Sequence, residues 1–136
     1  MIRSFLSKKT LILLDSTSID SVLREMSEKN ISSALIKNSS EEIVGIVTER
    51  DVLKNIATLD VDRKLSRPIR VIMSRPVKFV AYDNIVPEIQ ELLSNKSLRH
   101  FPVVKKSDDN SASNVMGMLT ATDFFNLALN LLTESQ

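Results

Sequence analysis

Two short motifs place an aspartate three residues after a threonine, a spacing that suits the binding of phosphorylated sugars. Thr48 and Asp51 form the first motif, and Thr120 and Asp123 form the second. At the start of a helix, a threonine hydroxyl and the unpaired backbone N–H groups can donate to a phosphate. An aspartate one turn further on offers two acceptor oxygens, which suit the vicinal hydroxyls of a ribose. Each motif can therefore hold both groups.

The same spacing also has a purely structural interpretation. Thr-x-x-acid at a helix start is a capping box, in which the threonine accepts a backbone N–H and the acid reaches back. For one motif taken alone, capping is the stronger interpretation. The duplication favours ligand binding, because Gly45 and Gly117, the only two glycines among 136 residues, each begin a Gly-x-x-Thr-x-x-Asp copy. Both copies also follow an expected strand directly, a common place for ligands of α/β folds.

A basic segment could supply further groups for an anion. Residues 61–78 contain Arg63, Lys64, Arg67, Arg70, Arg75 and Lys78 against one acid, Asp62. In a chain of net charge +1, this concentration could serve phosphates, and its alternative is a solvated linker. The near-neutral charge and the lack of aromatic residues among the basic ones argue against nucleic-acid binding.

Composition narrows the function classes. His100 is the only histidine and cysteine is absent, which argues against a metal site and excludes a thiolate nucleophile. No Ser-His-Asp or Cys-His constellation can be named, so we expect a protein that is not an enzyme. No apolar run reaches the roughly 18 residues of a membrane span. We therefore expect a cytoplasmic protein without a membrane partner.

The elements that position the two motifs recur along the chain. A shift of 67 lays residues 2–8 over 69–75 with three identical positions. The later motifs are related by a shift of 72, because five extra residues fall in the polar stretch 105–114. The repeat predicts two domains, 1–67 and 68–136.

Each domain is predicted to have the order β-α-β-β-α. In the first, strands are expected at 10–14, 34–36 and 43–47, with a helix from 19 that Thr17 or Ser18 caps and another from Thr48. In the second, the strands are expected at 78–81, 101–104 and 115–119, and the last helix at 123–132. One unit of this size buries too little surface alone. We therefore expect an α/β (α+β) fold with the units packed sheet to sheet in pseudo-twofold symmetry.

The last helix is apolar on nearly every side, and a helix of this kind must be covered. Burial between the two halves and a surface for self-association are both consistent with this pattern.

Several motifs together resemble a tandem cystathionine-β-synthase (CBS) domain pair, also called a Bateman module. They are Ile-Arg-x-x-Met-Ser-Arg-Pro at 69–76, Arg-His-Phe-Pro-Val-Val at 99–104, and the paired Gly-x-x-Thr-x-x-Asp. The resemblance covers essentially the whole chain. It implies a stand-alone regulatory module that binds AMP, ADP, ATP, S-adenosylmethionine or NAD in a cleft between the two motifs. It also implies a homodimer and an unidentified regulated protein, with no required cofactor.

The resemblance also assigns roles to residues. Asp51 and Asp123 would hold ribose hydroxyls, and Thr48 and Thr120 would contact phosphate, with Arg50 and Thr122 as secondary phosphate contacts. The adenine side would be lined by Ser32, Ser33 and Ala34 in one half and by Arg99, His100, Phe101 and Pro102 in the other. Thr10 and Lys78 would close the clefts.

One departure from the family pattern favours the second motif. The family often has a proline in the second strand, as Pro102 is here, but the first half has Ala34-Leu35-Ile36. The alternative function is a ligand-free dimerisation or protein-interaction module, in which both Thr-x-x-Asp motifs act only as helix caps.

Overall fold

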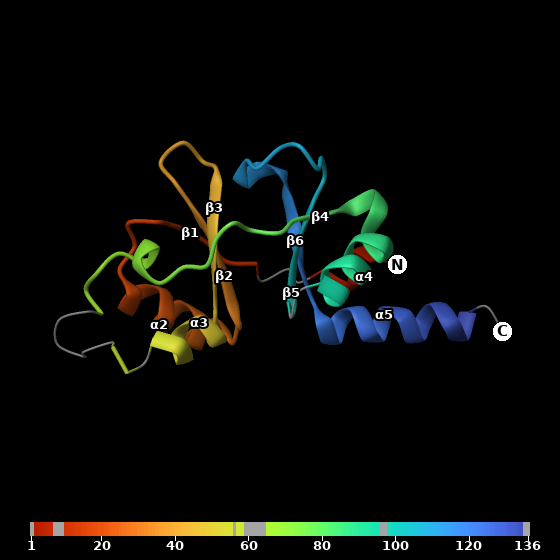
Figure 1. The fold of residues 1–136 in the computed structure, drawn as a ribbon, viewed down its shortest axis with the longest axis horizontal. Coiled ribbons are helices and arrows are strands. Elements are labelled where there is room, and N and C mark those ends of the chain that lie inside the picture. Colours follow the sequence, from red (N-terminus) through yellow and green to blue (C-terminus); the bar gives the residue numbers. More distant parts are fainter. Residues whose placement is uncertain (1, 7–9, 56, 59–64, 96–97, 135–136) are drawn as a thin grey trace. The chain divides into compact units, whose positions relative to one another are not determined.

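The computed structural model describes residues 2–6, 10–55, 57–58, 65–95 and 98–134 of the chain (Figure 1). The chain forms two compact units. The first unit is Lys9–Val77, and the second unit combines Met1–Lys8 with Lys78–Gln136. These units follow the sequence repeat except at the segment that opens each copy. Residues 68–77, which open the second copy, belong to the first unit, and residues 1–8, which open the first copy, belong to the second unit.

In its described residues, the first unit has a three-stranded sheet and two α-helices (Figure 1). Its elements are β1 (Ile12–Leu14), α2 (Ile19–Lys29), β2 (Ser33–Lys37), β3 (Ile43–Thr48) and α3 (Glu49–Asn55). The strand order is β1-β2-β3, with β1 parallel and β3 antiparallel to β2. The predicted β-α-β-β-α order of this unit is confirmed.

Helix α2 shows why its sequence is helical. Ile19, Val22 and Met26 are buried, and their spacing puts them on one face. Ser18 is the N-cap, as predicted, because its side chain accepts the N–H of Ser21 at 3.1 Å. The helix ends at Asn30, whose left-handed conformation (φ 53°) is typical of a helix C-terminus.

The core of the first unit lies on one face of its sheet. Val22 and Met26 of α2 pack there with Ala34 and Ile36 of the central strand β2 and Val47 of the edge strand β3. Half-buried Val52 of α3 joins the same cluster, so both helices cover the same face.

Backbone hydrogen bonds join segment 65–77 to the rest of the first unit. The N–H of Ile69 donates to Thr17 O at 2.7 Å, and the N–H of Ile19 donates to Arg67 O at 2.8 Å. Ile69 and Ile72 are buried in the core of this unit. These contacts explain why a segment that opens the second sequence repeat packs with the first unit.

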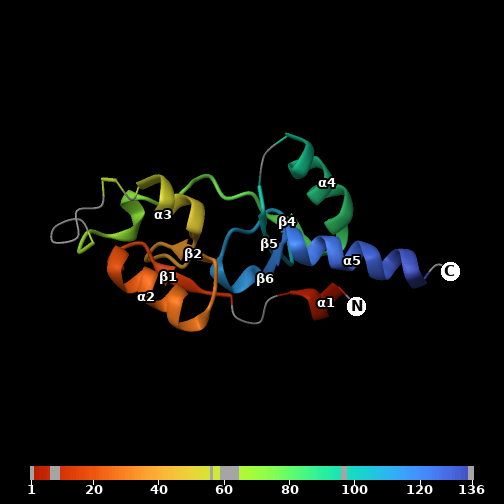
Figure 2. The same cartoon turned by 90° about the horizontal axis from the view of Figure 1, so that it is seen from below.

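The second unit repeats the arrangement (Figure 1). Its elements are α1 (Ile2–Phe5), β4 (Val80–Ala81), α4 (Ile85–Asn95), β5 (His100–Val104), β6 (Val115–Thr120) and α5 (Ala121–Glu134). The strand order is β4-β5-β6, with β4 parallel and β6 antiparallel to β5. Helix α1 lies beside α5 (Figure 2).

The core of the second unit is centred on Phe101, whose side chain is fully buried. Val103 and Leu119 flank it from the sheet, Ile85 and Ile89 come from α4, and Leu6 follows α1. The α1 segment therefore completes this core, although it lies at the other end of the chain.

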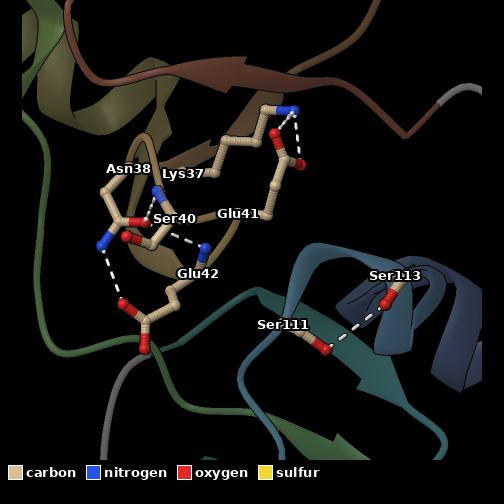
Figure 3. A network of polar contacts seen from close by, with 7 residues as sticks. All are labelled: Lys37, Asn38, Ser40, Glu41, Glu42, Ser111 and Ser113. Carbon is tan, nitrogen blue, oxygen red and sulfur yellow. Dashed lines mark hydrogen bonds and ion pairs between the residues drawn. The ribbon is translucent and has the colours of Figure 1, made fainter.

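The two β-hairpins differ in how their loops are held. In the first unit, Asn38 Oδ1 accepts the N–H groups of Ser40 and Glu42 at 3.0 Å, and Lys37 pairs with Glu41 at 2.8 Å (Figure 3). This is a short turn. Such bonds between a side chain and its own loop backbone fix the turn locally.

The predicted longer loop of the second unit joins β5 to β6. Buried Asn114 donates to Lys106 O at 2.8 Å and to Asp109 O at 2.6 Å, and it accepts the N–H of Lys106 at 3.0 Å. Ser111 contacts Ser113 on the outside of the loop (Figure 3). The side chain and backbone N–H of Ser111 also lower the pKa of Asp109, because both donate to its carboxylate. The side-chain amide of Asn114 thus holds together the loop that the five extra residues lengthen.

Helix α5 has a buried and an exposed apolar side. Leu127 is buried, whereas Phe125, Leu129 and Leu132 are exposed by 61%, 45% and 64%. The described helices include none that is long and apolar enough to cross a bilayer.

Candidate functional site

The first Thr-x-x-Asp motif lies where β3 ends and α3 begins. The N–H of Thr48 donates to Asp51 Oδ2 at 2.8 Å, and the Thr48 hydroxyl donates to the same oxygen at 3.2 Å. In return, the N–H of Asp51 donates to Thr48 Oγ1 at 3.4 Å. These reciprocal bonds are those of a capping box, so the motif does cap its helix.

Asp51 has a further partner that the sequence did not suggest for the site. The Ser74 hydroxyl donates to Asp51 Oδ1, so both carboxylate oxygens have donors from the chain itself. Asp51 is buried, with 8% of its surface exposed. The sequence repeat could have pointed to Ser74, because it is one of the three positions that are identical when residues 2–8 are laid over 69–75.

The second motif lies at the junction of β6 and α5. The N–H of Thr120 donates to Asp123 Oδ2 at 3.0 Å, and the N–H of Asp123 donates to Thr120 Oγ1 at 3.1 Å. This motif is also a capping box. Asp123 is half-buried, and no donor to its Oδ1 occurs within the described part of the chain.

In each unit the fold brings the motif to the residues expected on the adenine side. Ser33 pairs with Thr48 across β2 and β3, and His100 pairs with Thr120 across β5 and β6. The residue before each pair also bonds to the helix start. The N–H of Glu49 donates to Ser32 O at 3.2 Å, and the N–H of Ala121 donates to Arg99 O at 2.8 Å.

Thr10 and Lys78 lie at the same ends of their sheets. Each precedes by two residues the first strand of its unit, which is parallel to the strand that begins at Ser33 or His100. The motif therefore sits at the amino ends of the parallel strand pair and at the carboxyl end of the antiparallel strand. Within each unit, the predicted residues converge on one end of the sheet.

The predicted residues on the adenine side differ in burial, and therefore in whether a ligand can reach their side chains. Ser33, Ala34, Phe101 and Pro102 are buried, and Phe101 belongs to the core of its unit. Where such side chains are enclosed, their strands present mainly backbone groups. Arg99 is exposed, and Ser32 and His100 are half-buried.

The secondary phosphate candidates are exposed side chains in the first turns of their helices, Arg50 in α3 and Thr122 in α5. The basic residues Arg67, Arg70, Arg75 and Lys78 are exposed as well, whereas Asp62, Arg63 and Lys64 lie outside the described residues. Within the described ranges, no three His, Asp or Glu side chains gather as metal ligands would.

Comparisons with known proteins agree with this architecture. A family model for the CBS domain matches the chain twice, at residues 2–58 and 69–130. An uncharacterised 17.7 kDa protein of Acidianus ambivalens is 30% identical over 99 residues, which are 73% of this chain and 58% of that protein. The uncharacterised protein MK0525 of Methanopyrus kandleri is 35% identical over 101 residues, 73% of this chain and 47% of that protein. The match thus spans about half the length of these relatives.

Solved structures share the fold over nearly the whole chain. The CBS domain structure of NE2398 has a TM-score of 0.75 at 26% identity, covering 94% of this chain and 96% of that one. The CBS domain pair of protein MJ0100 has a TM-score of 0.74 at 25% identity, covering 96% of both chains. The latter was solved in complex with 5′-methylthioadenosine and S-adenosyl-L-methionine.

Proposed function

The chain belongs to the CBS domain family, with two copies of the domain in tandem, and we propose that this regulatory module binds an adenosine-containing ligand without converting it. The ligand class comprises AMP, ADP, ATP, S-adenosylmethionine and NAD. Two adenosine compounds are bound by the CBS domain pair of MJ0100, which supports this class. The ligand acts as a regulatory signal, and the module requires no cofactor.

The observation that carries the proposal is the composition of the sheet end at α5. Thr120, Asp123 and the backbone of Arg99 and His100 meet there through the bonds and strand pairing described above. Asp123 uses Oδ2 to cap the helix and keeps Oδ1 without a donor among the described residues. A half-buried carboxylate oxygen beside a helix N-terminus can accept a ribose hydroxyl while the helix dipole favours a phosphate.

The residue roles follow from this position. Asp123 accepts from the ribose, Thr120 donates to a phosphate, and exposed Thr122 is a second phosphate donor. The adenine lies against the start of β5, from Arg99 to Pro102, with Lys78 at the same end of the sheet. The corresponding residues of the first unit lie at the same end of its own sheet; they are Thr10, Ser32 to Ala34, Thr48, Arg50 and Asp51.

The regulatory step is a shift between conformations. A ligand changes the state of a module only by the difference in its affinity for two conformations. We therefore propose that the bound nucleotide favours one conformation, which a partner protein then recognises.

We expect adenosine ligands to raise the melting temperature of the protein, because binding to the folded state stabilises it by mass action. A ligand at 100 times its Kd adds about 2.7 kcal/mol. Asp123→Ala should weaken binding about tenfold or more, since the ribose loses its acceptor. The measurement is a thermal-shift screen with AMP, ADP, ATP, NADH and S-adenosylmethionine, followed by calorimetry.

The matched control is Asp108→Ala, which removes an exposed aspartate from the β5–β6 loop and should leave affinity unchanged. Melting temperatures that no ligand raises would support the second candidate function, a ligand-free interaction module. The capping boxes at Thr48 and Thr120 favour that alternative, because they show that both motifs already have a structural role.

We also propose that the module forms a homodimer through α5. Phe125, Leu129 and Leu132 lie at i, i+4 and i+7 on one exposed helix face. A contiguous exposed apolar stripe typically marks an interaction surface.

Phe125→Glu is expected to convert the dimer to a monomer, because it places a charge in the apolar stripe. Sedimentation velocity measures the oligomeric state. Asn126→Glu adds the same charge at the adjacent exposed position and should leave the dimer intact. A monomeric wild-type protein, or equal dissociation of both variants, would exclude this interface.

A further inference from the structure

The segment around Ser74 lies along the outer edge of β3. The N–H of Ser74 donates to Ile46 O at 2.8 Å, and the N–H of Ile46 donates to Ser74 O at 3.0 Å. The two residues form an antiparallel bridge. Because β3 is the edge strand of the sheet in the first unit, this bridge pairs backbone groups that an edge strand leaves open.

The Ser74 side chain adds a second attachment at the same place. Its hydroxyl donates to Asp51 Oδ1, while Oδ2 accepts the N–H and the hydroxyl of Thr48. Ser74 lies 23 residues further along the chain than Asp51. The carboxylate therefore joins three parts of the first unit: the end of β3, the start of α3 and the segment that follows the 3₁₀ turn at Ile69–Val71.

We propose that the hydrogen bond from Ser74 to Asp51 has two effects. It closes the first motif, which means that Ser74 holds Asp51 Oδ1 in place of a ligand, and it fastens the segment around Ser74 to the junction of β3 and α3. With the Ser74 hydroxyl on Oδ1 and two groups of Thr48 on Oδ2, three donors already bond to a carboxylate that accepts about four, so a ribose hydroxyl would compete with Ser74 for Oδ1. Ser74 is thus a positioning residue, and Asp51 links its segment to Thr48 at the end of β3. If an adenosine ligand binds as proposed above, its affinity should therefore depend on Asp123 and not on Asp51; this consequence rests on the proposed function.

Hydrogen exchange in the ligand-free protein tests the fastening. In Ser74→Ala, the amides of Ile46 and position 74 should exchange about tenfold faster, which corresponds to about 1.4 kcal/mol. Asp51→Asn should accelerate the same two amides, and the double variant should add little, because both changes remove one contact. Helix amides of α2, such as that of Val22, which donates to Ser18 O, should keep their rates. A general loss of stability would instead accelerate them all.

Asp123→Asn is the matched control, since it alters the other capping box and should leave the Ile46 and Ser74 amides unchanged. Unchanged exchange of these amides in Ser74→Ala would overturn the fastening. So would accelerations that simply multiply in the double variant, because they would show that the two side chains act independently.

Calorimetry with AMP tests the closure of the first motif. Asp51→Asn should leave AMP affinity within about twofold of wild type, whereas Asp123→Asn should lower it at least tenfold. Equal losses in the two variants would overturn the closure, because Asp51 would then hold ligand despite Ser74. If AMP and the other adenosine ligands bind to no variant and not to wild type, the proposed function fails, and the exchange result still decides whether Ser74 fastens the segment.

Discussion

Replacing Phe101 by alanine is expected to lower the free energy of unfolding by about 3–5 kcal/mol. The Phe101 side chain is fully buried in the core of the second unit, which also contains Ile85 and Ile89 of α4 and Leu119 of β6. Truncation removes this apolar burial and leaves a cavity that the surrounding strands can close only in part. Urea unfolding followed by amide signals from β5 and β6 measures the loss in the unit where it occurs.

The matched control is Phe125→Ala, which deletes the same side chain from an exposed position and should change stability by less than about 0.5 kcal/mol. If α5 mediates self-association, any effect of this control will depend on protein concentration. Equal losses in the two variants would contradict the central position of Phe101.

A second variant separates the core role of Phe101 from a ligand contact. Phe101→Leu keeps a large apolar side chain and is expected to fold, with a smaller loss than alanine. Because the ring is enclosed by the core, the ligand-induced rise in melting temperature should be the same as in wild type. A reduced rise would show that the ring itself contacts the ligand.

The order of elements was predictable because its signals are local. The spacing of Ile19, Val22 and Met26 specifies a helix, and Ser18 supplies the cap that begins it. The hairpins follow from short apolar runs on either side of polar turns, where Asn38 bonds to its own loop backbone. Signals of this kind need no knowledge of the rest of the chain.

The exchange of segments between the repeats was not predictable in the same way. Ile69 and Ile72 are apolar residues that open the second sequence repeat, and their pattern shows that they are buried without showing where. Backbone bonds to Thr17 and from Ile19 place their segment in the first unit. The pairing of distant segments is a tertiary property, and single-sequence periodicity does not contain it.

The candidate site shows the same limit. Thr48 with Asp51 and Thr120 with Asp123 have identical spacing, and both form the capping boxes that the sequence indicates. At Asp51, the hydroxyl of Ser74 from a distant segment is a further donor, to Oδ1. Ser7, the residue that the sequence repeat aligns with Ser74, lies outside the described residues. The spacing therefore predicts the bond of each carboxylate through Oδ2, but it does not predict which distant residue bonds to Oδ1, as Ser74 does at Asp51.

Gly45 provides the second large effect: Gly45→Val is expected to lower the free energy of unfolding by about 3 kcal/mol, and Gly45→Ala by about 1–2 kcal/mol. The cause is steric crowding and not backbone conformation, because neither Gly45 nor Gly117 has a positive φ. A Cβ atom at Gly45 would lie 2.8 Å from Met73 Cγ and 3.2 Å from Met73 Cβ, and closest to Met73 Sδ. Those distances leave no room for a methyl group unless Met73 moves.

The crowding has a specific source. Ile46, next to Gly45, pairs with Ser74, next to Met73, so the backbone bridge itself holds the methionine over the glycine. A side chain at position 45 must either displace Met73 or break the bridge on which the Ser74–Asp51 contact depends. The expected loss thus reports how firmly the segment is held to β3.

A double-mutant cycle with Met73→Ala tests this explanation. Met73 is half-buried, so its truncation has a cost of its own, but it removes the Cγ and Sδ atoms that the new side chain meets. We expect Gly45→Val with Met73→Ala to be more stable than the sum of the two single changes by at least 1 kcal/mol, measured by urea unfolding. Strict additivity would show that Met73 is not the obstacle. The glycine at the start of the first motif would then need another explanation than the close approach of this segment.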